Sequence, residues 1–206
     1  MLYDITRTVS ATTAVWPGDT PYSTEPQWQL AAGQSVNLLT ITTTPHVGTH
    51  ADAYYHYEPD GAFPVGMPLD AYIGRARVMT VSKRDGALTP ADLPASPEGA
   101  ERLLIHSHVS DQPDSAWATE FPYLSVELIE WLAGFGIVLI GLDSPSVDAF
   151  DSEALPCHHA LPRNNMVNLE NLMLRGIPDG DYELIALPLK LDHVCASPVR
   201  AVLRTL

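Results

Sequence analysis

The sequence is short of several features, and each shortage excludes a class of protein. It contains only two cysteines, Cys157 and Cys195, which form neither a CxxC pair nor a disulfide framework. No apolar run approaches the ~20 residues that a membrane-spanning helix needs, and no signal peptide is recognisable at the N-terminus. These absences predict a reduced, cytoplasmic protein whose two thiols are incidental.

Basic residues are also scarce. Eleven Lys and Arg residues face 25 Asp and Glu residues, which gives a net charge of −14. Such a surface repels phosphate backbones and anionic lipids, so we expect neither nucleic acids nor membrane surfaces as partners. Because 46% of the residues are hydrophobic and only 17% are charged, we expect one folded domain over residues 1–206 with a substantial core.

The motifs of several common catalytic sites are missing too. There is no GxSxG nucleophile turn, no phosphate-binding P-loop, no GxGxxG dinucleotide fingerprint and no HExxH zinc motif. Residues 141–145 come nearest to the nucleophile turn, but Pro145 stands where a helix would have to begin. Cys157 lies beside two histidines, yet those imidazoles are better explained as metal ligands than as activators of a thiol nucleophile.

Short aliphatic and β-branched segments, most of them bounded by Gly, Pro or Asp, dominate the pattern of the chain. Seven are predicted as strands: residues 3–8, 38–43, 76–82, 102–107, 137–142, 182–191 and 200–205. One helix is expected over residues 125–133, capped by Ser125 and ended by Gly134, and a shorter one near Pro90. Residues 152–172 are ambiguous. Many strands and few helices predict an α/β fold with a mixed sheet or partial barrel.

Histidines are concentrated in one stretch. Three of the eight, His46, His50 and His56, fall within eleven residues, together with Asp52. On an extended strand His46 and His50 stand ~13 Å apart, too far to share one ion, so a turn at Gly48 must bring them together. His50 and Asp52 share one face and can flank an ion, whereas His56 is better placed for acid/base work. Imidazole and carboxylate together suit Zn²⁺ or Mn²⁺, and a carboxylate can bridge two ions.

A second group of ligand types follows in residues 157–170. His158 or His159 can supply another imidazole, and Glu170 another bridging carboxylate. Three further histidines are interpreted as structural or pocket-lining: His106, His108 and His193.

These residues resemble the signature of the metal-dependent cyclase family. The stretch His46-x-Gly48-Thr49-His50-x-Asp52-x-x-x-His56 is similar to the family pattern HxGTHxDxxxH. Other similar segments bring the resemblance to nearly the whole chain: residues 3–6, 15–21, 140–148 and 158–170. The chain departs from a common family pattern at Asn164 and Asn165, where a glycine is often found, although asparagine tolerates left-handed backbone angles.

The resemblance implies a homodimer with the cyclase-family fold and two zinc ions in each subunit, with manganese as the other option. The metal ligands that it implies are His46, His50, Asp52, His158 and Glu170. It further implies that Asp52 and Glu170 bridge the two ions, that His56 is the general acid/base and that Trp16 contacts the substrate. Without the resemblance, Trp16 would be interpreted as a core tryptophan that anchors the turn at Pro17.

Within the family the chain is most similar to arylformamidases. The resemblance therefore implies hydrolysis of N-formyl-L-kynurenine to L-kynurenine and formate in tryptophan degradation. Two alternatives stay open. One is another amidohydrolase of the family, such as an enzyme that opens the cyclic amide of isatin. The other is a metal-binding protein without catalysis, against which His56 argues because metal storage needs no proton shuttle.

Overall fold

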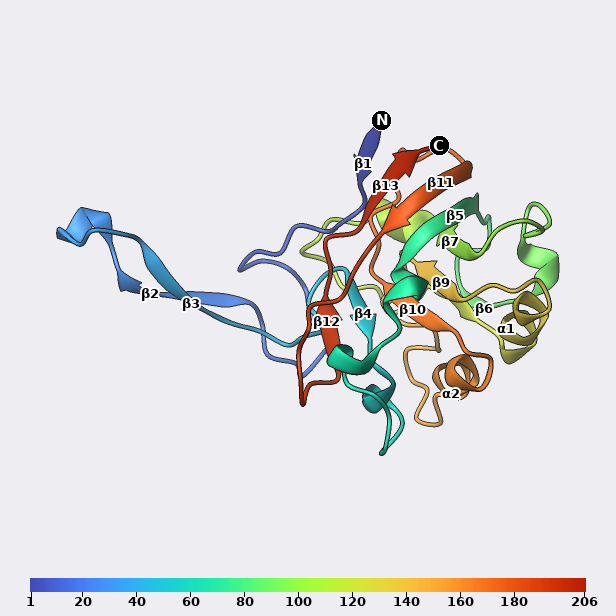
Figure 1. Ribbon diagram of the computed structural model, residues 1–206, viewed down its shortest axis with the longest axis horizontal. Coiled ribbons are helices and arrows are strands. Elements are labelled where there is room, and N and C mark those ends of the chain that lie inside the picture. Colours follow the sequence, from blue (N-terminus) through green and yellow to red (C-terminus); the bar gives the residue numbers. More distant parts are fainter.

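The computed structural model describes residues 1–206 and is built around a curled sheet of nine strands (Figure 1). These strands are β1 (Leu2–Asp4), β4 (His50–Asp52), β5 (Ile73–Thr80), β7 (Arg102–His106), β9 (Leu139–Leu142), β10 (Val167–Glu170), β11 (Gly180–Ile185), β12 (Ala196–Pro198) and β13 (Val202–Thr205). Across the sheet they follow the order β1-β13-β11-β5-β7-β9-β10-β4-β12. The pairs β5–β7, β7–β9 and β9–β10 are parallel and the other pairs are antiparallel, so the sheet is mixed.

Only two α-helices accompany this sheet, α1 (Val126–Ala133) and α2 (Pro156–Arg163). The predicted cap of α1 is confirmed, because the Ser125 hydroxyl accepts a hydrogen bond from the backbone N–H of Leu128 at 3.0 Å. A mixed, curled sheet with few helices confirms the predicted fold class. Neither helix combines the length and the apolar character that crossing a membrane requires.

Several predicted elements differ in length or type from those observed. The short helix expected near Pro90 is a single 3₁₀ turn, Pro90–Asp92. The strand predicted over residues 182–191 ends at Ile185, and Pro188 beyond it has no N–H to continue a ladder. The ambiguous residues 152–172 form α2 followed by β10. Strands of three residues, such as β4, β12, β6 (Gly86–Leu88) and β8 (Pro122–Leu124), are too short to give a periodic signal.

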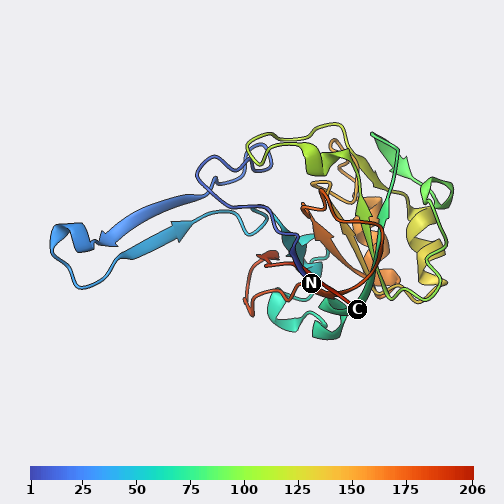
Figure 2. The ribbon, with the colours of Figure 1, turned by 90° about the horizontal axis from the view of Figure 1, so that it is seen from above.

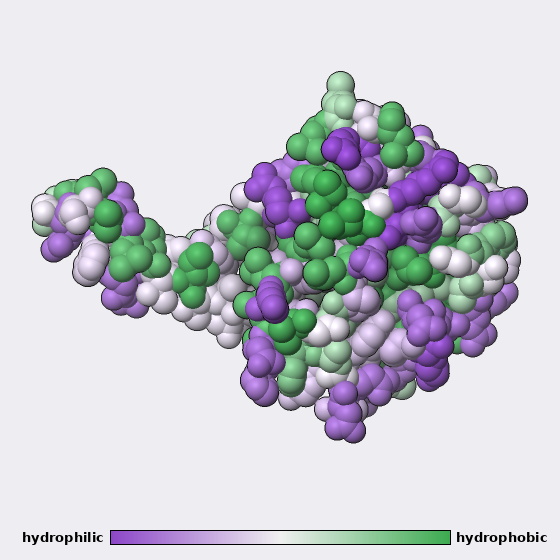
Figure 3. All heavy atoms as spheres, viewed as in Figure 1, coloured by the Kyte–Doolittle hydropathy of each residue, from purple (hydrophilic) through white to green (hydrophobic).

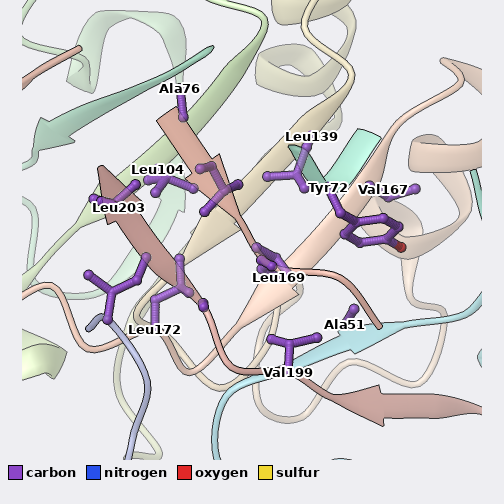
Figure 4. Packing of buried hydrophobic residues seen from close by; sticks show 14 of the residues in the cluster. Ala51, Tyr72, Ala76, Leu104, Leu139, Val167, Leu169, Leu172, Val199 and Leu203 are labelled. Atoms are coloured by element: carbon purple, nitrogen blue, oxygen red, sulfur yellow. The ribbon is translucent and has the colours of Figure 1, made fainter. Parts of the chain in front are cut away.

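Both faces of the central strands are covered by apolar side chains. On one face Leu104 and Leu139 join the cluster that fills the curl of the sheet (Figure 4). On the other face Leu103 and Ile140 pack with residues of α1 and α2. Successive residues of a strand point to opposite faces, so covering both faces explains why residues 103–105 and 137–142 are continuous apolar runs.

A second, separate sheet forms an arm that projects far from the body (Figures 1 and 2). It consists of β2 (Ser23–Trp28) and β3 (Leu38–Thr42), which pair only with each other, in antiparallel register. Every residue of both strands is exposed. Only β3 was predicted, because β2 is largely polar and contains Pro26, which lowers its strand propensity.

Candidate metal centre

The register of β4 brings ligand-type side chains from two strands together. β4 lies between β10 and β12, with His50 opposite both Glu170 and Pro198. Because side chains alternate along a strand, His50 and Asp52 project from the same face of β4. His50, Asp52 and Glu170 are each less than 5% exposed, which is exceptional for such polar groups. The sheet therefore gathers an imidazole and two carboxylates in a nearly dry interior.

The predicted turn at Gly48 is confirmed. Gly48 has a φ of +59°, in the left-handed region, and a Cβ there would come within 3.0 Å of the side chain of Val9. The turn folds His46 back toward His50, with 4.9 Å between the ring centroids. The Nδ1 atom of His50 lies 2.9 Å from the Gly48 carbonyl oxygen, and donation to it leaves Nε2 directed at the carboxylates.

The nitrogen and oxygen atoms of the cluster are spaced as neighbouring ligands of a metal ion. Around Asp52, His46 Nδ1 lies 3.2 Å and His50 Nε2 3.4 Å from Oδ1, and His158 Nε2 lies 3.6 Å from Oδ2. Around Glu170, His50 Nε2 lies 3.4 Å from Oε2 and His158 Nε2 lies 3.7 Å from Oε1. Ligands held ~2.0–2.2 Å from a tetrahedral ion stand ~3.3–3.6 Å apart.

Two buried atoms of this cluster have no hydrogen-bond partner, His50 Nε2 and Asp52 Oδ1. Leaving buried polar atoms unpaired costs stability, whereas a shared cation satisfies both at once. His46, His50 and Asp52 together offer three ligand atoms that lie within 4.8 Å of one another. The donor set of neutral imidazole and carboxylate fits Zn²⁺ or Mn²⁺.

Helix α2 directs one of the two adjacent histidines at the cluster. His158 Nδ1 donates to Asp148 Oδ2 at 2.7 Å, so its Nε2 faces Asp52 and Glu170. His159 instead pairs with Glu58 at 2.8 Å and is about one-third exposed. Of the two imidazoles that the sequence left open, the structure thus brings His158 to the cluster and turns His159 away.

Two residues that the sequence analysis missed hold the ligands in place. The Asn168 side-chain amide donates to Asp52 Oδ2 at 2.8 Å and to Glu170 Oε1 at 3.1 Å. Asp148 accepts from the His158 ring and from the backbone N–H groups of Cys157 and His158. A partner of this kind fixes the orientation of a ligating imidazole. The one available signal for Asn168 was its place two residues before Glu170, on the same strand face.

Asn165, one of the two asparagines that depart from the family pattern, lies in the turn between α2 and β10. Asn165 adopts a left-handed φ of +55° just after the end of α2. The turn that leads into β10, and so to Glu170, therefore forms with asparagine in a conformation that usually favours glycine.

The carboxylates shift the protonation of the histidines strongly. Burial by itself lowers the pKa of His50, but the attraction of the neighbouring Asp52 and Glu170 carboxylates outweighs it and raises the pKa to about 10. His158 behaves in the same way and has a pKa of about 10, and His46 reaches about 9. The pKa of Asp52 lies well below its usual range, because the attraction of the three neighbouring histidines outweighs the effect of burial. Without a metal, the centre therefore holds protons on its imidazoles at neutral pH.

A cavity of about 320 Å³ opens above the cluster. His56 lies in its wall with an exposed side chain, and its ring centroid is 4.3 Å from that of His46 and 5.8 Å from that of His158. Trp16 is only partly buried and lines the same cavity. It packs against Trp117 and Phe150, with centroid distances of 5.5 and 5.0 Å.

Cys195 also lines the cavity, although the sequence analysis took both cysteines to be incidental. Its Sγ lies 3.2 Å from His46 Nε2, and this contact together with the nearby His56 lowers its pKa to about 6. Cys157 is buried among apolar residues, and this burial raises the pKa of its thiol. The structure therefore places Cys195, unlike Cys157, beside the candidate centre, because the pairing of β12 with β4 brings it there.

The three remaining histidines lie outside the cluster. His106 contacts Thr80, with 3.3 Å between Nδ1 and Oγ1. His108 lines a different cavity, and His193 is 81% exposed at its side chain.

A curled mixed sheet with a buried His/Asp/Glu cluster defines a candidate metalloprotein. The chain belongs to the Cyclase family, which it matches over residues 3–149. This range contains the whole stretch from His46 to His56 and ends before His158.

Solved structures share this fold over nearly the whole chain. They include a potential metal-dependent hydrolase with cyclase activity, with a TM-score of 0.82 and 24% identity over 98% of this chain and 96% of the other. A predicted metal-dependent hydrolase from Bacillus stearothermophilus has a TM-score of 0.81 and 24% identity, covering 98% and 97%. Isatin hydrolase A from Labrenzia aggregata has a TM-score of 0.81 and 24% identity, covering 98% and 93%. The cyclase-family fold is thereby confirmed.

Proposed function

We propose that the chain is a metal-dependent amide hydrolase with two cations in its centre. The observation that carries the proposal is the convergence of five ligand-type side chains, two of which, His50 and Asp52, hold buried polar atoms without hydrogen-bond partners. His46, His50 and Asp52 would hold one cation, and His158 and Glu170 the other, with both carboxylates shared. Divalent cations held there lower the pKa of water and polarise a carbonyl oxygen. Zinc is the expected metal and manganese the alternative.

His56 is the proposed general acid/base. Its side chain is exposed to the cavity, close to His46 but outside the buried cluster. In that position it can accept a proton from the attacking water and deliver one to the nitrogen that leaves. The amide C–N bond breaks, the water oxygen joins the carbonyl carbon, and the amine departs neutral.

The aromatic wall favours a substrate with an aryl group. Trp16, supported by Trp117 and Phe150, offers an apolar face beside the ligand cluster. A cavity of about 320 Å³ suits a small molecule rather than a polymer. We infer that the substrate is N-formyl-L-kynurenine, so that the products are formate and L-kynurenine. The chain would then act as a kynurenine formamidase in tryptophan degradation.

A second candidate is the opening of a cyclic aryl amide such as isatin. It is favoured by the fold shared with isatin hydrolase A. The two reactions need the same cations and the same proton transfer, and they differ in whether the amine leaves or stays tethered to the product.

One comparison tests both candidates. Hydrolysis of N-formyl-L-kynurenine and of isatin is followed by absorbance with the purified protein, after chelation, and after zinc or manganese is restored. We expect kcat/KM for the formamide to exceed that for isatin, and activity to vanish on chelation and return with metal. Preference for isatin selects the second candidate. Full activity in rigorously metal-free protein refutes metal dependence, and inactivity on both substrates leaves a non-catalytic metal-binding protein.

We also propose that two copies of the chain form a homodimer through the arm. The hairpin exposes six large apolar side chains, each at least 47% exposed: Trp28, Leu30, Val36, Leu38, Leu39 and Ile41. Figure 3 shows apolar atoms along the arm on the face that it presents. An isolated two-stranded hairpin is marginally stable in water, so this arm needs a surface to pack on.

The same chain carries an apolar surface that can receive the arm of a second copy. Five large apolar residues of the body are at least 40% exposed: Val65, Leu69, Ile73, Leu187 and Leu189. They come from two neighbouring segments, since Ile73 pairs with Ile185 and the N–H of Val65 donates to Leu191. An apolar arm and an apolar patch on one chain allow an isologous dimer. Light scattering coupled to size exclusion should give twice the mass of the chain, and a monomer would refute this proposal.

A further inference from the structure

The imidazole of His46 stands between two different groups. Its Nδ1 atom lies 3.2 Å from Asp52 Oδ1, on the side of the buried cluster. Its Nε2 atom lies 3.2 Å from Cys195 Sγ, on the opposite side of the ring. One histidine thus presents one nitrogen to the carboxylates and the other to a thiol.

His56 completes the group on the thiol side. His46, His56 and Cys195 each offer a ligand atom, and these atoms all lie within 4.8 Å of one another. All three residues line the cavity, and none is fully buried. A cation can therefore reach them from solvent without passing the buried cluster.

Two imidazoles and a thiolate are a soft ligand set, which selects Zn²⁺, Co²⁺ or Cd²⁺ over Mg²⁺ or Ca²⁺. We propose that His46, His56 and Cys195 form an auxiliary site for a thiophilic divalent cation at the mouth of the metal centre. This site shares His46 with the centre, because the two nitrogens of that ring face Asp52 and Cys195 respectively.

Occupation of this site has a consequence for turnover, and that consequence rests on the proposed function. A cation bound to the His56 imidazole removes the nitrogen that would carry the proton. The auxiliary site therefore acts as an inhibitory site, through which excess soft metal stops a reaction that depends on the metals of the centre.

Cobalt(II) provides a readout that does not depend on activity. Thiolate bound to Co²⁺ gives a charge-transfer band in the near ultraviolet, which imidazole and carboxylate ligands do not give. Co²⁺ is titrated into the zinc-loaded protein, and the band is recorded for the wild type, Cys195→Ser and Cys157→Ala. The last variant is the matched control, because Cys157 is the only other thiol and lies in the core.

We expect a band that saturates at one added equivalent in the wild type and in Cys157→Ala, and no band in Cys195→Ser. Loss of a group that merely supports a ligand weakens metal binding ~10–100-fold. Loss of the thiolate itself should therefore lower the affinity for the added Co²⁺ equivalent at least as much. Inhibition, expressed relative to each variant's own uninhibited rate, should follow the band. Absence of the band in the wild type, its persistence in Cys195→Ser or its loss in Cys157→Ala would overturn the auxiliary site. A wild-type band in a protein that hydrolyses neither substrate would support the site and refute the proposed function.

Discussion

β4 and the β2–β3 arm follow one another closely in the chain but have opposite surroundings. β4 is hydrogen-bonded on both edges, to β10 and β12, and all three of its residues are buried. β2 and β3 pair only with each other, and all of their residues are exposed. All of these strands are short, so the difference comes from their neighbours and not from strand propensity.

The two regions differ in what holds their backbone in place. β4 is held within the chain, which lets it fix the positions of His50 and Asp52 as a metal centre requires. The arm has no such support within the chain, and under the proposed dimer it packs on a second copy. Both ends of the arm lie at the cavity. The backbone N–H of Thr44 donates to the carbonyl oxygen of Thr20 at 3.1 Å, and the cavity is lined by Thr44 and by Asp19, the residue before Thr20. Under the proposed dimer, a second copy that covers the arm would also stabilise one wall of the cavity.

The largest effect is expected from breaking the ligand set on β4. His50→Ala removes a buried ligand, so metal content and activity should fall together. Water bound to the cation is acidified from a pKa of ~15.7 toward ~7, and losing that effect should lower kcat more than about 10⁴-fold. Elemental analysis and kcat on N-formyl-L-kynurenine decide the matter, with His193→Ala as an exposed histidine control. Unchanged metal content would remove His50 from the ligand set.

His56→Ala tests a residue next to the same cluster that is proposed to move protons instead of holding metal. The variant should keep its fold and most of its metal but lose ~10²–10⁴-fold in kcat, as for a lost general acid/base. The same two measurements apply. Metal loss as severe as in His50→Ala would make His56 a ligand of the buried centre, and wild-type turnover would leave the proton shuttle to be found elsewhere.

Raising the pH should strengthen metal binding by the centre. The raised pKa values, about 9 for His46 and about 10 for His50 and His158, keep these rings protonated at pH 7 in the metal-free protein. Each must lose a proton to bind, so affinity should rise at least about tenfold per pH unit between pH 7 and 9. Competition with a chelator at buffered free metal measures this, and a flat profile would show that the rings are already neutral.

The same raised histidine pKa values predict that the metal-free fold loses stability as the pH rises. A histidine whose pKa is raised on folding stabilises the fold below its usual pKa, and that contribution is lost as the pH rises through the folded value. The melting temperature of the metal-free protein should therefore fall as the pH approaches 9 to 10, while metal-loaded protein should lose less.

Substitution in the arm should leave the body intact and weaken only the dimer. Burying an isoleucine is worth ~1.5–3 kcal/mol, so Ile41→Asp should raise the dimer dissociation constant at least ~10-fold. Thr40→Asp, a neighbouring exposed position, is the control for added charge. Sedimentation measures the dimer and thermal melting at high protein dilution measures the body. Equal dissociation constants for Ile41→Asp and the wild type would contradict an interface through this side chain.

The smallest effect is expected from Trp16→Ala. Stacking of an aryl substrate adds ~0.5–1.5 kcal/mol beyond burial, which corresponds to a ~2–10-fold rise in KM with a smaller change in kcat. Kinetics with N-formyl-L-kynurenine test this directly. A variant that unfolds, or that keeps the wild-type KM, would show that Trp16 supports Trp117 and Phe150 without contacting substrate.

Local features of this protein could be predicted from the sequence. The cap of α1 follows from the Ser125 hydroxyl, which accepts a backbone hydrogen bond, and the turn at Gly48 from a left-handed conformation that glycine favours. The concentration of His46, His50 and Asp52 within a few residues likewise indicates a candidate metal site by composition alone. The pattern of many strands and two helices was enough for the fold class.

Contacts between distant segments could not be predicted. Asp148 orients His158, Asn168 joins Asp52 to Glu170, and Cys195 meets His46 across a strand pair, and none of these partners is close in sequence to the motif. The exposure of the arm could not be predicted either, because it depends on the absence of a neighbouring strand in the folded protein.

The amino-acid sequence by itself determined which chemical groups this protein can use and where the chain turns, because residue type and backbone preference are local properties. The tertiary structure alone decided which of these groups meet. His158 rather than His159 faces the carboxylates because α2 presents that side to β10, and Cys195 joins the cavity because β12 pairs with β4. Strand order and register are set by packing over the whole chain, so the final composition of the centre depends on the complete fold.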